Sequence, residues 1–112
     1  MTVHNTLGNG FQEVIYQRAL SIELRFNDIS HVREQEMPIC YRDEQIGTRR
    51  VDFFVESEVM VEIKTIEKLE GKHFTQAINY LEAYELADGL LINFGGTSLE
   101  FKRVFNKKLK KS

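Results

Sequence analysis

Three ionisable side chains have the spacing that metal-assisted phosphodiester chemistry requires. Asp52 precedes Glu62 by ten residues, and Lys64 follows Glu62 by two. Carboxylate oxygens are hard ligands suited to Mg²⁺, which keeps several waters and can hold a substrate phosphate. Such a metal lowers the pKa of a bound water, and a nearby ammonium group neutralises charge that develops on the phosphoryl group. The three residues predict a metal-binding, acid–base site if the fold brings them together.

A β-hairpin is the element that would position them. Residues equidistant from a turn centred on Ser57 face each other, so Asp52 opposes Glu62 and Arg50 opposes Lys64. Directly opposed β-carbons lie about 4.5–5.5 Å apart, and two carboxylates that close share a proton, find cations or bind a metal. The other face of the hairpin is apolar at period two on both arms, and consists of Val51, Phe53, Val55, Val59, Val61 and Ile63.

A solvated face of an amphipathic hairpin is the alternative interpretation, since Asp, Glu and Lys are common there. The hairpin alone does not decide between the two. Phe54 and Met60 share the predicted polar face, and a fully wetted face rarely carries two large apolar side chains. These two side chains favour the metal-binding site over the solvated face.

The rest of the chain predicts an α/β domain. Apolar periodicity predicts helices over 11–26 and 73–86, and strands over 32–42, 46–55, 59–65, 90–94 and 99–105. Pro38 in the first strand is compatible with an edge position or a bulge. The order αβββαββ indicates a mixed sheet flanked by helices. We expect one domain over 1–106 and a basic C-terminal tail over 107–112.

The net charge of −2 is unevenly distributed. Residues 101–112 carry six of the 15 basic residues and no acidic one, which leaves 9 basic against 17 acidic residues in 1–100. A protein that neutralises phosphates non-specifically is usually basic over its body. Nucleic-acid contacts would therefore come from local patches, namely the tail and Arg49 and Arg50, although a frayed, solubilising terminus explains the tail equally well.

The compartment follows from what the chain lacks. No apolar run approaches the roughly 20 residues needed to span a bilayer, and Met1 to Leu7 do not resemble a signal peptide. Cys40 is the single cysteine, so no internal disulfide can form, and its apolar context predicts a small core residue. We expect a cytoplasmic protein with no membrane contact.

Four motifs resemble the PD-(D/E)XK nuclease superfamily. Asp52 with Glu62-Ile63-Lys64 is similar to its D…(E)XK motif, although Val51 replaces the proline. Gly10 to Tyr16 matches the signature that names its GxxExxY family, and Gln76 to Tyr80 resembles the QxxxY element of its RecB-like branch. The segment 89–95 is also similar to that family. One isolated triplet has little specificity, but the four motifs stand in the expected order over nearly the whole chain.

This resemblance implies a restriction-endonuclease-like core and specific roles for its residues. It implies Mg²⁺, with Mn²⁺ as a substitute, held by Asp52, Glu62, the backbone carbonyl of Ile63 and also Glu13, while Lys64 assists catalysis. An ordinary carboxylate at a helix N-terminus is the alternative for Glu13. Gln76 and Tyr80 lie on one helical face and would position Lys64 or a phosphate, or form a structural pair.

The leading hypothesis is a Mg²⁺-dependent nuclease that acts on DNA or RNA. The alternative is a catalytically weak or inactive module of the same fold that binds protein or nucleic acid. With 112 residues the chain leaves no room for a separate recognition domain, so a homo-oligomer or a partner protein would supply recognition. Family members carry a further helical stretch ahead of the segment that resembles Val3-His4, and we expect a truncated form here.

Overall fold

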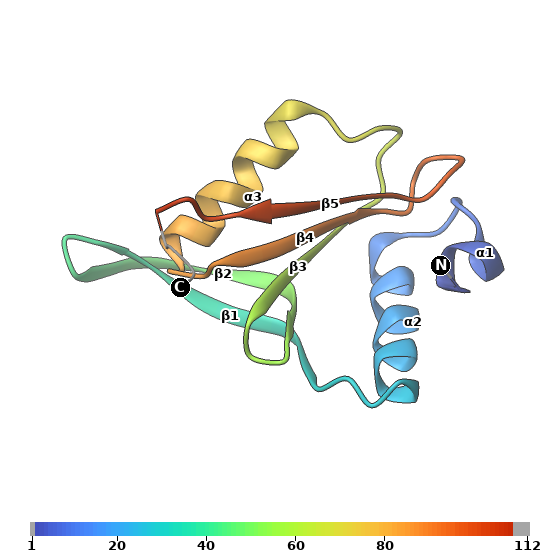
Figure 1. Ribbon diagram of the computed structural model, residues 1–112, viewed down its shortest axis with the longest axis horizontal. Coiled ribbons are helices and arrows are strands. Elements are labelled where there is room, and N and C mark those ends of the chain that lie inside the picture. The colour runs from blue at the N-terminus through green and yellow to red at the C-terminus, as the bar shows by residue number, and fades with distance from the viewer. Residues whose placement is uncertain (1, 109–112) are drawn as a thin grey trace.

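A five-stranded mixed sheet with helices on both faces forms the fold (Figure 1). The computed structural model describes residues 2–108. The elements are α1 (Thr2–Leu7), α2 (Glu13–Phe26), β1 (His31–Tyr41), β2 (Glu44–Val55), β3 (Val59–Lys64), α3 (Gly71–Ala83), β4 (Asp88–Asn93) and β5 (Glu100–Phe105). The strands stand in the order β1-β2-β3-β4-β5. The pair β3–β4 is parallel because α3 crosses over between them, and the other pairs are antiparallel.

The predicted order of elements is confirmed, with one addition. The helix α1 was not predicted, because six residues are too few for a periodic pattern and form no stable helix alone. It is held by tertiary contacts, since Val3 is buried in the core. The helix α3 begins two residues earlier than expected, because Glu70 and His73 form a reciprocal capping box at its start. Within residues 2–108, no helix is long and apolar enough to cross a membrane.

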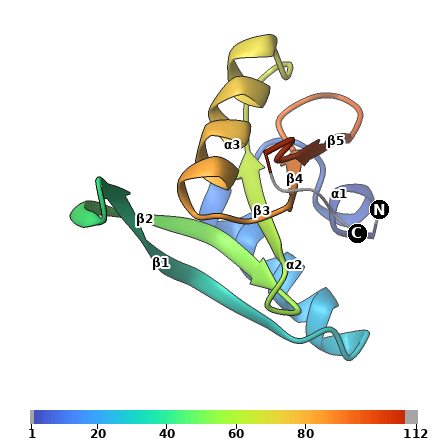
Figure 2. The same cartoon turned by 60° about the vertical axis from the view of Figure 1, so that its left-hand side comes forward.

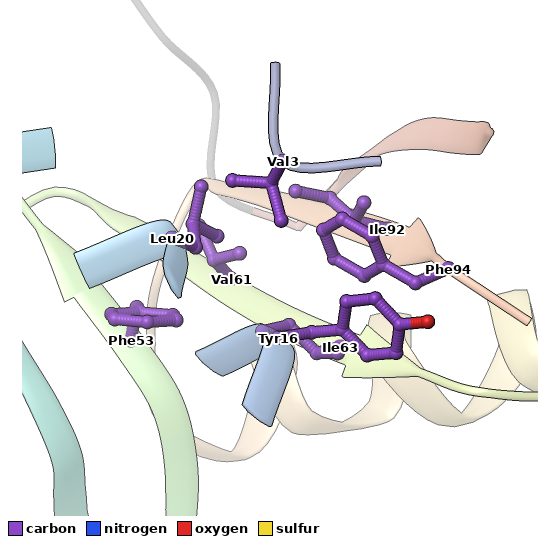
Figure 3. Packing of buried hydrophobic residues seen from close by; sticks show 8 residues of the cluster. All are labelled: Val3, Tyr16, Leu20, Phe53, Val61, Ile63, Ile92 and Phe94. Carbon is purple, nitrogen blue, oxygen red and sulfur yellow. The ribbon is translucent and has the colours of Figure 1, made fainter. Parts of the chain in front are cut away.

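The core consists of two apolar clusters that lie on different sides of the sheet. The first joins α1 and α2 to the sheet through Val3, Tyr16, Leu20, Phe53, Val61, Ile63, Ile92 and Phe94 (Figure 3). The Tyr16 ring stacks on Phe94 at 4.6 Å, and its hydroxyl donates to the carbonyl of Gly8 at 2.6 Å. These contacts fix the turn before α2 and therefore the position of Glu13. The second cluster lies under α3 and includes Val51, Met60, Leu81 and Leu91.

The register of the β2–β3 hairpin is the one expected from the sequence. Phe53 pairs with Val61, Phe54 with Met60 and Val55 with Val59. Glu56 and Ser57 both have positive φ, at 53° and 55°, as a type I′ turn requires, although neither residue is glycine or asparagine. Counting residues from the predicted turn therefore gave the correct register for the three residue pairs nearest that turn.

Away from the turn, the ladder between β2 and β3 ends at the pair Phe53–Val61, so the predicted strand pair of Asp52 with Glu62 does not form. Two further expectations were wrong in this part of β2. Val51 packs in the second cluster with Met60 and Leu81 and not beside Phe53 in the first. Arg50 does not oppose Lys64, because the ladder ends at Phe53 and Arg50 is exposed, 3.9 Å from Glu34. The far part of the β1–β2 hairpin extends away from β3 (Figure 2). Strand twist rotates residues here, so alternation no longer predicts their face.

The edge strand β1 carries Pro38 opposite Thr48, as the sequence indicated. A register shift between Ile39 and Cys40 marks a bulge in this strand. Cys40 is exposed, so the expectation of a core cysteine was wrong. This segment belongs to an edge strand, where most side chains are exposed to solvent.

A buried asparagine fastens the far end of the sheet. Asn93 is fully buried, and its side-chain oxygen accepts N–H groups from Ile66 and Gly95, each at 3.0 Å. Its amide nitrogen donates to Glu100 at 2.9 Å, which also accepts the Leu69 N–H at 3.1 Å. This network connects the loop after Lys64 to the end of β4 and the start of β5, and so fixes the end of β3.

Candidate active site

Glu62 is a buried carboxylate in the middle of β3. It is 4% exposed, between Val61 and Ile63, and its Oε1 accepts a hydrogen bond from Arg49 at 2.8 Å. Burial and the neighbouring Asp52 carboxylate raise the pKa of Glu62 to about 8, although Arg49 opposes this rise. A buried ionisable group beside a second one is typical of functional sites.

Asp52 lies at the point where β2 and β3 separate. Its Oδ2 accepts the Ile63 N–H at 2.7 Å, and its Oδ1 accepts a hydrogen bond from Gln17 of α2 at 3.3 Å. Its negative charge raises the pKa of both Glu62 and Glu13, so the three carboxyl groups lie close together. The fold therefore brings Asp52 and Glu62 together, and it does so where a side chain replaces the β2 backbone as the partner of β3.

Glu13, the first residue of α2, adds a third carboxylate. Partial burial and the proximity of Asp52 raise its pKa, whereas Lys64 and Arg49 lower it. The Asp52 charge can disfavour the ionised form of Glu13 only at short range. Glu13, Asp52 and Glu62 therefore form one acidic group.

Lys64 and the two predicted residues of α3 line one narrow recess with Glu62. The recess lies between β3 and α3, and His73, Gln76, Ala77, Tyr80 and Leu91 complete its wall. Lys64 is half-buried and its charge reaches Glu13. The structure therefore assembles all six side chains proposed from the sequence around the end of β3.

Two further residues of this site were missed in the sequence. Arg49 donates to Glu62, and its guanidinium lies 4.0 Å from the centre of the Tyr80 ring. The sequence predicts a basic patch at Arg49 and Arg50, but the twist of β2 turns only Arg49 toward Glu62. Gln17 follows Glu13 by one helical turn, and that spacing places both on one face of α2.

The donor set fits a divalent metal, although the ligands are not preassembled. Among residues 2–108, no group of three or more His, Cys, Asp or Glu side chains stands ready to hold an ion. Glu62 is engaged by Arg49, and Asp52 by Gln17 and Ile63. Yet the donors are hard oxygens, and the buried Oε1 of Gln17 lacks a hydrogen-bond partner in the described structure. Asp52, Glu62 and Glu13 would hold the ion, and Glu62 would have to leave Arg49.

The histidines have structural contacts. His73 accepts the Glu70 N–H at 2.9 Å in the capping box. His4 contacts the carbonyl of Gly96 at 3.3 Å and joins α1 to the loop before β5. Most of the predicted basic tail, residues 109–112, lies outside the described residues.

Comparisons with known proteins agree with this architecture. A family model described as the PD-(D/E)XK nuclease superfamily matches residues 1–104. A solved structure titled "Crystal structure of SSO0001" is similar, with a TM-score of 0.63 and 20% sequence identity over 81% of this chain. This chain spans 48% of the length of that one, and at such identity the similarity concerns the fold. No curated protein sequence matches this chain.

Proposed function

This chain belongs to the PD-(D/E)XK nuclease superfamily, and we propose that it is a Mg²⁺-dependent nuclease whose metal is held by Asp52 and Glu62. The observation that carries this proposal is the burial of Glu62, 4% exposed, against a second carboxylate. Such an arrangement destabilises the fold unless a cation compensates it. Selection for stability alone would favour an apolar residue at this position of β3.

In this proposal each side chain has a distinct part in phosphodiester hydrolysis. A bound Mg²⁺ would polarise the phosphate and lower the pKa of a coordinated water. Lys64 lies on the same face of β3 as Glu62, and its ammonium neutralises charge that grows on the phosphate oxygens. Gln76 and Tyr80, across the recess on α3, hold Lys64 or a phosphate oxygen in position. Glu13 accompanies Asp52 from α2 and adds a carboxylate ligand.

Arg49 supports the same proposal. Its guanidinium neutralises Glu62 in the metal-free protein, and the neighbouring Tyr80 ring keeps it at the recess. A guanidinium released from Glu62 is suited to bidentate contact with a phosphate. Arg49 would therefore exchange its carboxylate partner for substrate when a divalent ion occupies the site.

The experiment is a cleavage assay on single-stranded DNA, duplex DNA and RNA with Mg²⁺, Mn²⁺ or EDTA. We expect cleavage with the metals, none with EDTA, and none for Asp52→Asn. Glu44→Gln, an exposed acid of the same strand, is the matched control and should cleave like the wild type. If Asp52→Asn retains full activity, Asp52 holds no metal and the proposal is wrong.

The alternative is a nuclease-fold module that binds without cleaving. The pairing of Glu62 with Arg49 favours it, because an internal cation already compensates the buried charge. Calorimetric titration with Mg²⁺ and Mn²⁺ separates the two functions. A protein that binds nucleic acid but takes up neither metal at the acidic group is the binding module.

A further inference from the structure

The free edge strand β5 has an unusual outer face. Phe101 is 67% exposed and Phe105 is 49% exposed, although large aromatic side chains are normally covered. They alternate with exposed Arg103, so the three side chains lie on one face of the strand. Val104 points the other way and is buried under α3. β5 lies at the margin of the sheet in both ribbon views (Figures 1 and 2).

This face is basic as well as aromatic. The guanidinium of Arg103 lies 5.1 Å from the centre of the Phe105 ring, and Lys102 beside it is exposed. Residues 101–112 contain six basic and no acidic residues, whereas residues 1–100 carry a net charge of −8. Arg103 and Lys102 therefore place cations next to exposed aromatic rings, which complements a ligand that has both phosphates and flat rings.

We propose that the β5 edge, defined by Phe101, Arg103 and Phe105 on its outer face and by Lys102 on the opposite face, binds single-stranded nucleic acid. Unpaired bases stack on aromatic side chains without regard to sequence, and lysine and arginine neutralise the phosphates between them. A duplex keeps its bases within the helical stack and cannot use the two rings in this way. This inference rests on the proposed nucleic-acid substrate and specifies its strandedness.

A second copy of the chain is a poorer occupant of this edge. The antiparallel register that places Phe101 against Phe105 of a second β5 also places the two Arg103 residues directly opposite each other. Like charges at directly opposed positions destabilise strand pairing, and charged residues are the usual protection of an edge strand against such pairing. The phosphates of a nucleic acid are instead attracted by Arg103.

The register of the sheet connects Lys102, on the α3 side of β5, to the candidate active site. Lys102 pairs with Leu91, and Leu91 pairs with Glu62, so Lys102 lies two strands from the carboxylate at the same level. Adjacent strands are about 4.8 Å apart, which places the two backbones about 10 Å from each other.

Beyond the start of β5, a cavity of about 640 Å³ provides a route toward that site. It lies between the β4–β5 loop and the start of α3, and its lining includes Lys68 and Lys72 together with Glu67, Glu70 and Glu100. His73 lines both this cavity and the recess of Glu62 and Lys64. A single strand that crosses the edge of the sheet from the outer face of β5 would approach the recess past His73.

The test is binding of a fluorescein-labelled oligonucleotide, single-stranded or annealed to its complement, measured by anisotropy in EDTA so that no cleavage occurs. We expect the wild type to prefer the single-stranded form, whether DNA or RNA. The double variant Phe101→Ala, Phe105→Ala should weaken that binding about 10- to 100-fold, from the loss of stacked bases. Phe26→Ala removes a ring that is 83% exposed on α2 and is the matched control.

Charge variants provide a second readout. Arg103→Gln should weaken binding and lower the slope of log affinity against log salt by about 0.7, the value for one phosphate of a single strand. Arg18→Gln, an exposed arginine of α2, should change neither. A salt slope that is equal in Arg103→Gln and the wild type contradicts a phosphate contact at this residue.

The outcomes separate this inference from the proposed nuclease activity. If the β5 double variant binds as tightly as Phe26→Ala, the inference is wrong even where the wild type cleaves nucleic acid. If the wild type never cleaves but loses binding in the β5 variants, the inference stands and the nuclease proposal fails. A wild-type dimer that the double variant converts to monomers, seen by light scattering, assigns the face to a second copy instead.

Discussion

The charge of Glu62 gives a quantitative prediction for the metal-free protein. Glu62→Gln keeps the shape of the side chain and its acceptor for Arg49, while its amide nitrogen can donate to Asp52. The substitution therefore replaces a contact between two carboxylates by a hydrogen bond. We expect the variant to be more stable than the wild type at neutral and alkaline pH in the absence of divalent ions.

The magnitude follows from the pKa. Burial raises the pKa of Glu62 to about 8 in the fold, from an ordinary value of 4.5. Because this carboxyl loses its proton less readily in the fold than in the unfolded chain, its ionisation destabilises the fold. The free energy of unfolding should therefore fall as the pH rises from about 4.5 to about 8, and stay level above it. A pKa difference of one unit corresponds to about 1.4 kcal/mol. The ionisation of Glu62 therefore lowers the free energy of unfolding by at most roughly 5 kcal/mol.

The assay is urea denaturation of both proteins in EDTA at intervals from pH 5 to pH 9. The difference in unfolding free energy between Glu62→Gln and the wild type isolates Glu62, because the other titrating groups are common to both. It should grow in favour of the variant by a few kcal/mol across this range, less than the upper limit because the site relaxes and admits water. Glu44→Gln, at an exposed position, should show no such growth.

Divalent ions should reverse the comparison. Mg²⁺ at about 100 times its dissociation constant adds about 2.7 kcal/mol to the stability of a protein that binds it. We expect this gain for the wild type and none for Glu62→Gln. A difference that stays constant from pH 5 to pH 9 would refute the reasoning, because the carboxylate could not then be held against Asp52 in a buried site.

Three further predictions concern neighbouring residues. Lys64→Met should lower nucleic-acid cleavage about 10²–10³-fold while Mg²⁺ affinity by calorimetry and melting temperature change little; equal cleavage would leave Lys64 without a catalytic role. Arg49→Met should tighten Mg²⁺ binding several-fold by calorimetry, since the guanidinium competes for Glu62, and Arg50→Met, exposed, should not; weaker binding would mean that Arg49 positions the ligand. Gly95→Ala should lower stability by roughly 1–3 kcal/mol in thermal denaturation, because a Cβ there meets the Ile66 backbone; an unchanged melting temperature would show that the loop yields freely.

The sequence by itself determined the elements and the local register of the site. Alternation of apolar residues over 51–63 and the turn at Ser57 were sufficient to pair Phe53 with Val61, because side chains of a strand alternate at a fixed period of two. The same period placed Glu62 and Lys64 on one face. Helical spacing placed Gln76 and Tyr80 together on α3. These relations span few residues and depend on backbone geometry alone.

The tertiary structure decided which charges meet and how strongly they interact. The separation of β2 from β3 sends Val51 to the second cluster and Arg49 to Glu62, a rotation that depends on how the β1–β2 hairpin packs near α3. The contact of Gln17 with Asp52 depends on the docking of α2. The raised pKa of Glu62 arises from burial between layers, because desolvation is set by every group that surrounds a side chain and not by its neighbours in sequence.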